Sequence, residues 1–248
     1  FTYCRKLIFQ ASLVGLMVSP LLFLFVAGNI GGDLASAIDP LMISIAFSSK
    51  AGQAVLVLFL GFLLVSLWSY LLPKQIWTIV IAGFSCILIS FSVYGHSTIN
   101  GYTSQLLIVL HLLAISYWVG SFFPLRYSTY RDIEDEKLFQ IAHKFGIYAV
   151  YYILVLLVAG VSLGTILVGS LNGLLYSTYG QVFLLKLSLV SILLGIGAMN
   201  KFKLVPNLQS NGNANAVKLR KSIGREIIIL AFILVISSIV STSIEPPY

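Results

Sequence analysis

An all-α membrane bundle of about seven transmembrane helices is the fold class that this sequence predicts. Of its 248 residues, 58% are hydrophobic and only 9% are charged, whereas a soluble domain carries roughly a quarter charged residues. The mean hydropathy is +0.99. The apolar residues also gather into stretches near the ~20 residues that a bilayer-spanning helix needs. Helices are the economical structure for such stretches, because lipid offers no partner to unpaired strand edges.

Seven apolar stretches can be placed along the chain. They cover about 7–27, 53–72, 76–94, 103–124, 144–168, 181–199 and 225–244. We therefore expect a single transmembrane domain over residues 1–248, spanning the membrane several times. The chain starts at Phe1 rather than at Met, so we expect it to be processed or to begin inside a longer protein.

The basic residues predict how the bundle is oriented. Lys50 is the only one in the loops of one side, and thirteen lie in the loops of the other. These thirteen are Arg5, Lys6, Lys74, Arg126, Arg131, Lys137, Lys144, Lys201, Lys203, Lys218, Arg220, Lys221 and Arg225. Because cytoplasmic loops carry the excess of Lys and Arg, we expect a cytoplasmic N-terminus and an extracytoplasmic C-terminus.

Several functional classes are disfavoured. The net charge of +7 does not indicate nucleic acid, because the basic residues are spread between apolar segments. Cys4 and Cys86 lie far apart in or beside membrane segments, so they predict no disulfide framework. The sequence has no Walker A motif, which argues against ATP-driven pumping by this chain alone. We expect a protein that is not an enzyme.

Two histidines carry the main functional prediction. His111 lies eight residues past Thr103, about 12 Å into its segment at the rise of an α-helix. An ionisable residue at such depth is costly unless it faces a protein interior, so it marks a functional site by default. His96 lies at the outer end of the preceding segment and can approach the same region. Converging imidazoles suit copper, zinc or haem iron; alternatively, His111 is simply hydrogen-bonded to a neighbouring helix.

Three further residues are candidates for transport or gating. Trp118 shares the face of His111 at helical spacing. Lys186 is the only basic residue inside an apolar segment, six residues past Gly180. Its long stem lets the ammonium reach the interface by snorkelling, and a structural or gating role in the bundle is the alternative. Tyr179 lies two turns before Lys186 on the same face and could cover it.

Soft ligands and outer acids complete the candidate site. Met17 and Cys86 lie within predicted helices, and Met42 lies in the long outer loop 28–50. Thioether and thiolate ligands favour Cu(I), although such residues in a membrane usually only pack. The acids predicted on the outer side are Asp33, Asp39 and Glu245, which could attract a cation. More often, acidic residues on a protein surface attract no specific cation.

Two shorter patterns concern the loops. Residues 49–53 (SKAGQ) at the start of the second segment resemble residues 177–181 (STYGQ) at the start of the sixth. Both stretches are predicted on the outer side, so they would be parallel copies. Residues 207–216 (NLQSNGNANA) predict a flexible loop without an apolar face.

Several stretches, taken together, resemble one family of membrane proteins. Residues 111–120 (HLLAISYWVG) are similar to the H-L-x-A-x-x-x-W-x-G signature of the copper resistance D (CopD) family, and Gly95-His96 to its preceding G-H. Further similarities lie at 177–187, 199–206, 219–226 and 243–246, so the resemblance is strongest over 93–248. Gln181 departs from the arginine that the family pattern has after Y-G.

The resemblance implies copper movement across the bacterial inner membrane, with a periplasmic CopC-type copper-binding partner. Family members commonly have an eighth helix, which would precede this chain. The expected cargo is a copper ion, Cu(I) or Cu(II), contributing to copper uptake or resistance. His96 and His111 would be its ligands. One alternative is a cytochrome b-like redox subunit, linked to haem or quinone, in which the two histidines hold haem. The other is an assembly factor that holds copper. Direction, coupling ion and oligomeric state are not encoded in any pattern we can identify.

Overall fold

The computed structural model describes residues 2–71, 76–94, 101–130, 135–210, 212–244 and 247. Helices make up 92% of the structure, and none of the described residues lies in a strand. An all-α polytopic membrane bundle is therefore confirmed. His96 and Glu245 lie outside the described residues.

Each of the seven predicted segments is a helix. They are α1 (Thr2–Gly31), α3 (Lys50–Tyr70), α4 (Trp77–Ser92), α5 (Gly101–Ser128), α6 (Asp135–Val168), α8 (Thr178–Met199) and α9 (Gly212–Ser243). Six of them are long and apolar enough to cross a membrane, and α4, with 16 residues, is the shorter apolar helix. Which side of the membrane the two chain ends occupy stays a prediction.

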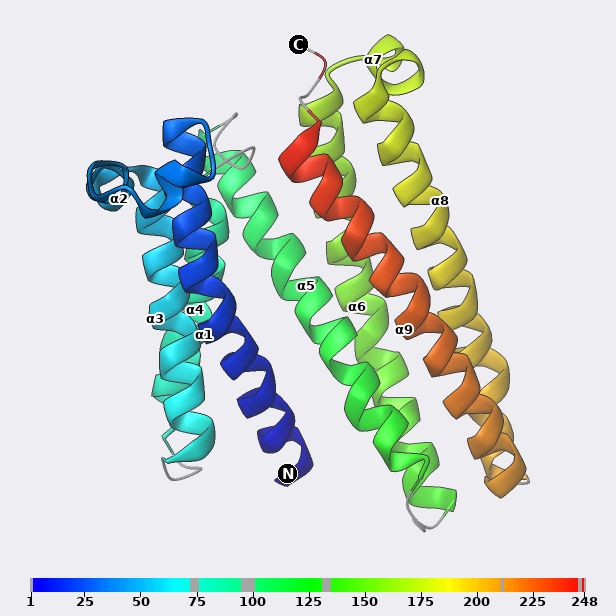
Figure 1. Cartoon of the computed structure of the whole chain (residues 1–248). Helices are drawn as coiled ribbons and strands as arrows, with labels where there is room; N and C mark the ends of the chain where they lie inside the picture. Colours follow the sequence, from blue (N-terminus) through cyan, green and yellow to red (C-terminus); the bar gives the residue numbers. More distant parts are fainter. Residues whose placement is uncertain are drawn as a thin grey trace. The chain divides into compact units, whose positions relative to one another are not determined.

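The chain forms two compact units. Unit 1 is Phe1–Val109 and unit 2 is Leu110–Tyr248, so α5 belongs to unit 2 from Leu110 onward. In unit 1, α3 packs against both α1 and α4 (Figure 1). The α3–α4 contact is close, because a Cβ on Gly61 would lie 2.7 Å from the Gly83 carbonyl oxygen. Only glycine at these two positions lets the helix backbones approach so closely.

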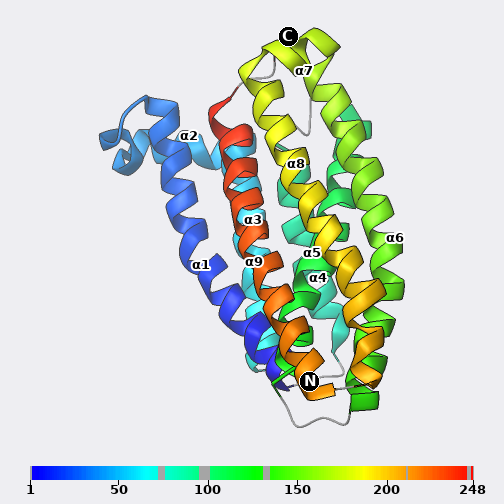
Figure 2. The ribbon, with the colours of Figure 1, turned by 90° about the vertical axis from the view of Figure 1, so that its right-hand side faces the viewer.

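Unit 2 packs helices α5, α6, α8 and α9 around one core. Its fully buried side chains include Phe122 of α5, Leu193 of α8 and Ile223 of α9. The short helix α7 (Leu171–Tyr176) joins α6 to α8 at one end of the unit (Figure 2). At that end Val168, Tyr179 and Val240 form a second apolar cluster.

The long outer loop is more ordered than we expected. It contains the 3-10 helix η1 (Ala35–Ile38) and the helix α2 (Pro40–Ser48). Asp39 caps α2, since its carboxylate accepts hydrogen bonds from the backbone N–H of Leu41 at 2.7 Å and of Met42 at 3.3 Å. An Asp N-cap followed by proline at the first helical position is a strong helix start. Placing Met42 in a loop was therefore wrong.

The similarity between residues 49–53 and 177–181 has a structural counterpart. Ser49 follows the short helix α2 and caps α3, accepting a hydrogen bond from the Gly52 N–H at 3.0 Å. Ser177 follows α7 and caps α8, accepting from the Gly180 N–H at 2.9 Å. Each unit thus contains a short helix, a serine cap and a long apolar helix, in the same order along the chain.

The prediction of a flexible loop over 207–216 is wrong. The chain passes from α8 through the π-helix η3 (Asn200–Leu204) and the 3-10 helix η4 (Pro206–Gln209), and α9 already starts at Gly212. Leu208 is fully buried in the core of unit 2, and Ala216 is buried as well. The Asn215 side chain donates a 2.6 Å hydrogen bond to the Asn207 carbonyl. The segment therefore has an apolar face after all.

Arg5 connects α1 to the end of α3, and this contact predicts a stability effect. Its guanidinium donates 2.8 Å hydrogen bonds to the carbonyls of Ser69 and Trp68, in the last turn of α3. Such carbonyls lack helical partners and carry the negative end of the helix dipole. We expect Arg5→Ala to lower the free energy of unfolding in detergent by about 1–3 kcal/mol. The neighbouring exposed Lys6 is the control: Lys6→Ala should leave thermal unfolding unchanged, and equal effects would contradict this assignment.

Candidate functional site

His111 is a half-buried residue of α5 in unit 2. Its ring packs directly on α6, because a Cβ on Gly160 would lie 3.0 Å from the His111 Cε1. Gly160 is eight residues from the end of α6 at Val168, or about 12 Å along the helix. His111 is therefore nearer the α7 end of unit 2 than the opposite end.

The imidazole of His111 has an unused nitrogen. Its Nδ1 is buried and has no hydrogen-bond partner among the described residues. A buried polar atom without a partner is costly, so native structures rarely leave one without a reason. The Leu156 carbonyl and the charged end of Lys186 both lie within interaction range of the ring. The ring can thus offer a nitrogen lone pair to a ligand within an apolar bundle.

Gly160 allows a test of this packing that removes no candidate ligand. An added methyl group at position 160 would meet the His111 Cε1 at 3.0 Å and the Nδ1 at 3.2 Å. We expect Gly160→Ala to shift the imidazole and so to weaken the copper binding predicted from the sequence about tenfold, the lower end of the effect seen when the outer support of a metal ligand is lost. Copper bound per purified chain is the measurement. Gly195→Ala is the control, since nothing lies within 4 Å of a Cβ there; equal binding by both variants would contradict the role of this contact.

The predicted gating residues all lie in unit 2. Trp118 is 4% exposed and packs edge-on against Phe122, with ring centroids 5.9 Å apart. Tyr179 is 4% exposed within the apolar cluster at the α7 end. Lys186 is half-buried on α8 and acts electrostatically on His111. Of the three, Lys186 is the one whose charge bears on His111.

The predicted sulfur ligands all lie in unit 1. Met17 is 73% exposed on α1. Cys86 is half-buried on α4 and carries a free thiol. Met42 is half-buried on α2, where a Cβ on Gly31 would lie 3.3 Å from its Cγ. Among the described residues, no three His, Cys, Asp or Glu side chains come together in a group that could hold a metal ion.

The predicted outer acids have structural roles where the structure describes them. Asp39 caps α2. Asp33 is exposed, and its carboxylate accepts a 2.7 Å hydrogen bond from the Ser36 backbone N–H. Hydrogen bonds from the hydroxyl and the backbone of Ser36 hold the pKa of the Asp33 carboxyl below its ordinary value. Both carboxylates thus hold local turns, and one oxygen of each is engaged.

Sequence reasoning missed a buried polar network in unit 2. The Asn200 amide donates a 3.1 Å hydrogen bond to the Glu226 carboxylate and accepts a 2.6 Å hydrogen bond from the Ser222 hydroxyl. Glu226 is 3% exposed. The sequence held a sufficient signal, because Glu226 is an acid inside the last apolar segment, and the rule that singled out His111 applies equally to it.

Comparison with known proteins supports a family assignment for both units. A sequence model described as "Copper resistance protein D-like, N-terminal domain" matches residues 2–105. A second, described as "Copper resistance protein D", matches residues 139–240. The chain belongs to the copper resistance protein D family. The two matches together cover well over half of the chain, and the boundary between units 1 and 2 falls between them.

One curated relative extends the comparison. The chain is 25% identical over 217 residues to the protein named "Copper transport protein CutJ" of Bacillus subtilis strain 168. The match takes in 82% of this chain but only 40% of that relative, so the chain spans less than half of the relative's length. No solved structure matches the chain.

Proposed function

We propose that this chain carries copper ions across a bacterial inner membrane through a site built on His111 and reached from the periplasm. The proposal rests chiefly on His111, a histidine inside a membrane-spanning helix with a buried Nδ1 that has no partner among the described residues. Imidazole nitrogen is a good ligand for copper. The membership of both halves of the chain in a copper-resistance family adds support.

The other candidate residues have different roles in this proposal. His96 is the second imidazole ligand, and Met42, Met17 and Cys86 are soft ligands of the access route. Asp33, Asp39 and Glu245 attract the cation at the outer face, and a CopC-type periplasmic protein delivers it. Trp118, Tyr179 and Lys186 control passage. With few ligands, the site would be weak enough to release its ion, as conduction requires.

Lys186 has a specific consequence for this mechanism. A positive charge on Lys186 would oppose a second cation bound at His111, since like charges in a bundle of low dielectric repel strongly. Lys186 would therefore favour one monovalent copper ion over a divalent one. This preference is consistent with the sulfur ligands proposed for the access route, because thioether and thiolate select Cu(I).

Transport by reconstituted protein tests the proposal. The purified full chain is placed in vesicles, and copper inside the vesicles is measured over time in the presence of a reductant. We expect copper, but not zinc, to accumulate faster than in protein-free vesicles. Equal rates in the two preparations would refute the proposal. An absorption spectrum of the same sample addresses the redox alternative, because bound haem would give a Soret band.

A further inference from the structure

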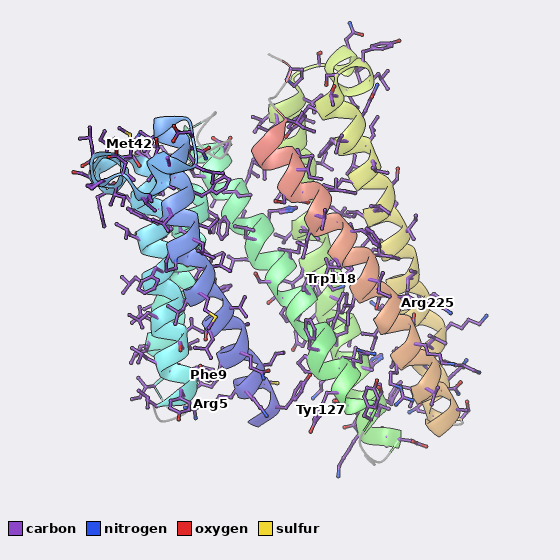
Figure 3. All side chains as sticks on the ribbon, viewed as in Figure 1. Arg5, Phe9, Met42, Trp118, Tyr127 and Arg225 are labelled. Carbon is purple, nitrogen blue, oxygen red and sulfur yellow. The ribbon has the colours of Figure 1, made fainter. Side chains whose placement is uncertain are left out.

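A basic cavity lies at the end of unit 2 that is opposite to α7. It is open and has a volume of about 560 Å³. Four cationic side chains line it: Arg126 from α5, and Arg220, Lys221 and Arg225 from α9. Figure 3 shows Tyr127 below Trp118 on α5, and Arg225 on α9. Among the described residues that line it, none carries a carboxylate.

Two of the arginines are arranged around one aromatic ring. The guanidinium carbon of Arg220 lies 4.2 Å from the Tyr130 ring centroid, and that of Arg126 lies 5.9 Å from it. Contacts of this kind hold a guanidinium by cation–π attraction and leave its edge free to donate hydrogen bonds. The Arg126 Nε is buried and has no partner among the described residues. Paired guanidinium edges of this type suit phosphate, which accepts two parallel hydrogen bonds from each.

The rest of the cavity is apolar. Ile227 and Ile228 line it, and Ile228 is 59% exposed. Both belong to the span Ala214–Val240, which is long and apolar enough to cross a membrane. A free phosphate would make no contact with this apolar wall. A lipid would cover it with an acyl chain while its headgroup meets the arginines.

We propose that the cavity lined by Arg126, Arg220 and Arg225 binds the phosphate headgroup of an anionic phospholipid, whose acyl chain lies along Ile227 and Ile228. Basic pockets between membrane helices are suited to such headgroups. This inference concerns a different part of unit 2 from His111 and does not depend on copper transport.

The unmodified full chain provides the first test. In detergent, its thermal unfolding is followed with added phosphatidylglycerol, with phosphatidylcholine or with inorganic phosphate, and retained lipid is counted by native mass spectrometry. We expect phosphatidylglycerol to raise the unfolding temperature and to remain bound, and the other two to have little effect. If phosphatidylcholine acts equally well, or if inorganic phosphate alone gives the full shift, the proposal is overturned.

Matched variants provide the second test. The double variant Arg126→Gln, Arg220→Gln removes two charges from the cavity. The control Lys144→Gln, Lys203→Gln removes two charges from exposed side chains outside its lining. We expect phosphatidylglycerol to bind the Arg126→Gln, Arg220→Gln variant at least about tenfold more weakly, since each basic group near a membrane surface contributes about 1 kcal/mol. Its affinity for the control variant should equal that for the unmodified chain. Equal weakening would show a general charge effect and overturn the site.

Discussion

Replacing His111 with alanine is expected to lower copper uptake by the reconstituted chain more than about tenfold, because losing even an outer partner of a metal ligand costs about 10–100-fold in metal affinity. The imidazole has a buried nitrogen without a partner among the described residues, inside a helix long enough to span a membrane. Its removal would take away the ligand and leave apolar neighbours that cannot replace it. Copper uptake and copper bound per chain are the measurements.

His143 is a suitable control for this prediction. It lies on α6, is exposed, and stacks on Phe139 with ring centroids 5.3 Å apart. His143→Ala should leave copper uptake at the level of the unmodified chain. His111→Gln separates the two roles of the imidazole, since an amide retains hydrogen bonding but is a poor ligand for copper. If His111→Ala and His111→Gln both transport normally, His111 is a packing residue and the proposed site is wrong.

The helices of this protein were predictable because their signal is strong and local. A window of about twenty apolar residues has one economical structure in lipid, so the seven segments could be placed from composition alone. The same reasoning predicts how deep in the membrane His111 lies, since a helix rises by a fixed amount per residue. Its packing on Gly160 could not be predicted, because the pattern G-x-x-x-G indicates a close helix contact without saying which residue makes it.

The connections between helices were harder to predict. Residues 207–216 are rich in Asn and Gly, and composition alone predicted a flexible loop. One apolar side chain, Leu208, is enough to fix the segment when it enters the core. The Asn207 carbonyl and the Asn215 amide then hydrogen-bond to each other across the start of α9. Polar side chains that a sequence suggests are exposed to solvent can thus cap helices or link segments by hydrogen bonds, once tertiary packing brings hydrogen-bond partners to them.

The proposed copper site is the least predictable part. His111 is in unit 2, while Met17, Met42 and Cys86 are in unit 1 and His96 lies outside the described residues. Periodicity fixes the face of a helix on which a residue lies, but not which faces of different helices meet. Whether these residues share one copper route could therefore not be predicted from the sequence.

The buried network around Asn200 yields the second large prediction. Asn200→Leu would leave the Glu226 carboxylate, which is 3% exposed, without the amide that donates to it, and would leave the Ser222 hydroxyl without its acceptor. Breaking a buried polar pair by removing one partner is costly, because the remaining group has lost both water and its hydrogen bond. We expect a loss of about 2–4 kcal/mol in the free energy of unfolding in detergent.

Two further variants decide whether the network causes this loss. Glu226→Gln keeps an oxygen that can accept from the Asn200 amide, so it should cost less than about 1 kcal/mol, the usual size of one hydrogen bond between membrane helices. The double variant Asn200→Leu, Glu226→Leu removes both ends of the bond and should recover much of the loss, since apolar pairs of similar size often replace buried polar pairs without penalty. Recovery requires that the two residues are coupled. If the double variant is instead as unstable as the sum of Asn200→Leu and Glu226→Leu, the two side chains act independently, and the π-helix at Asn200 is held by packing alone.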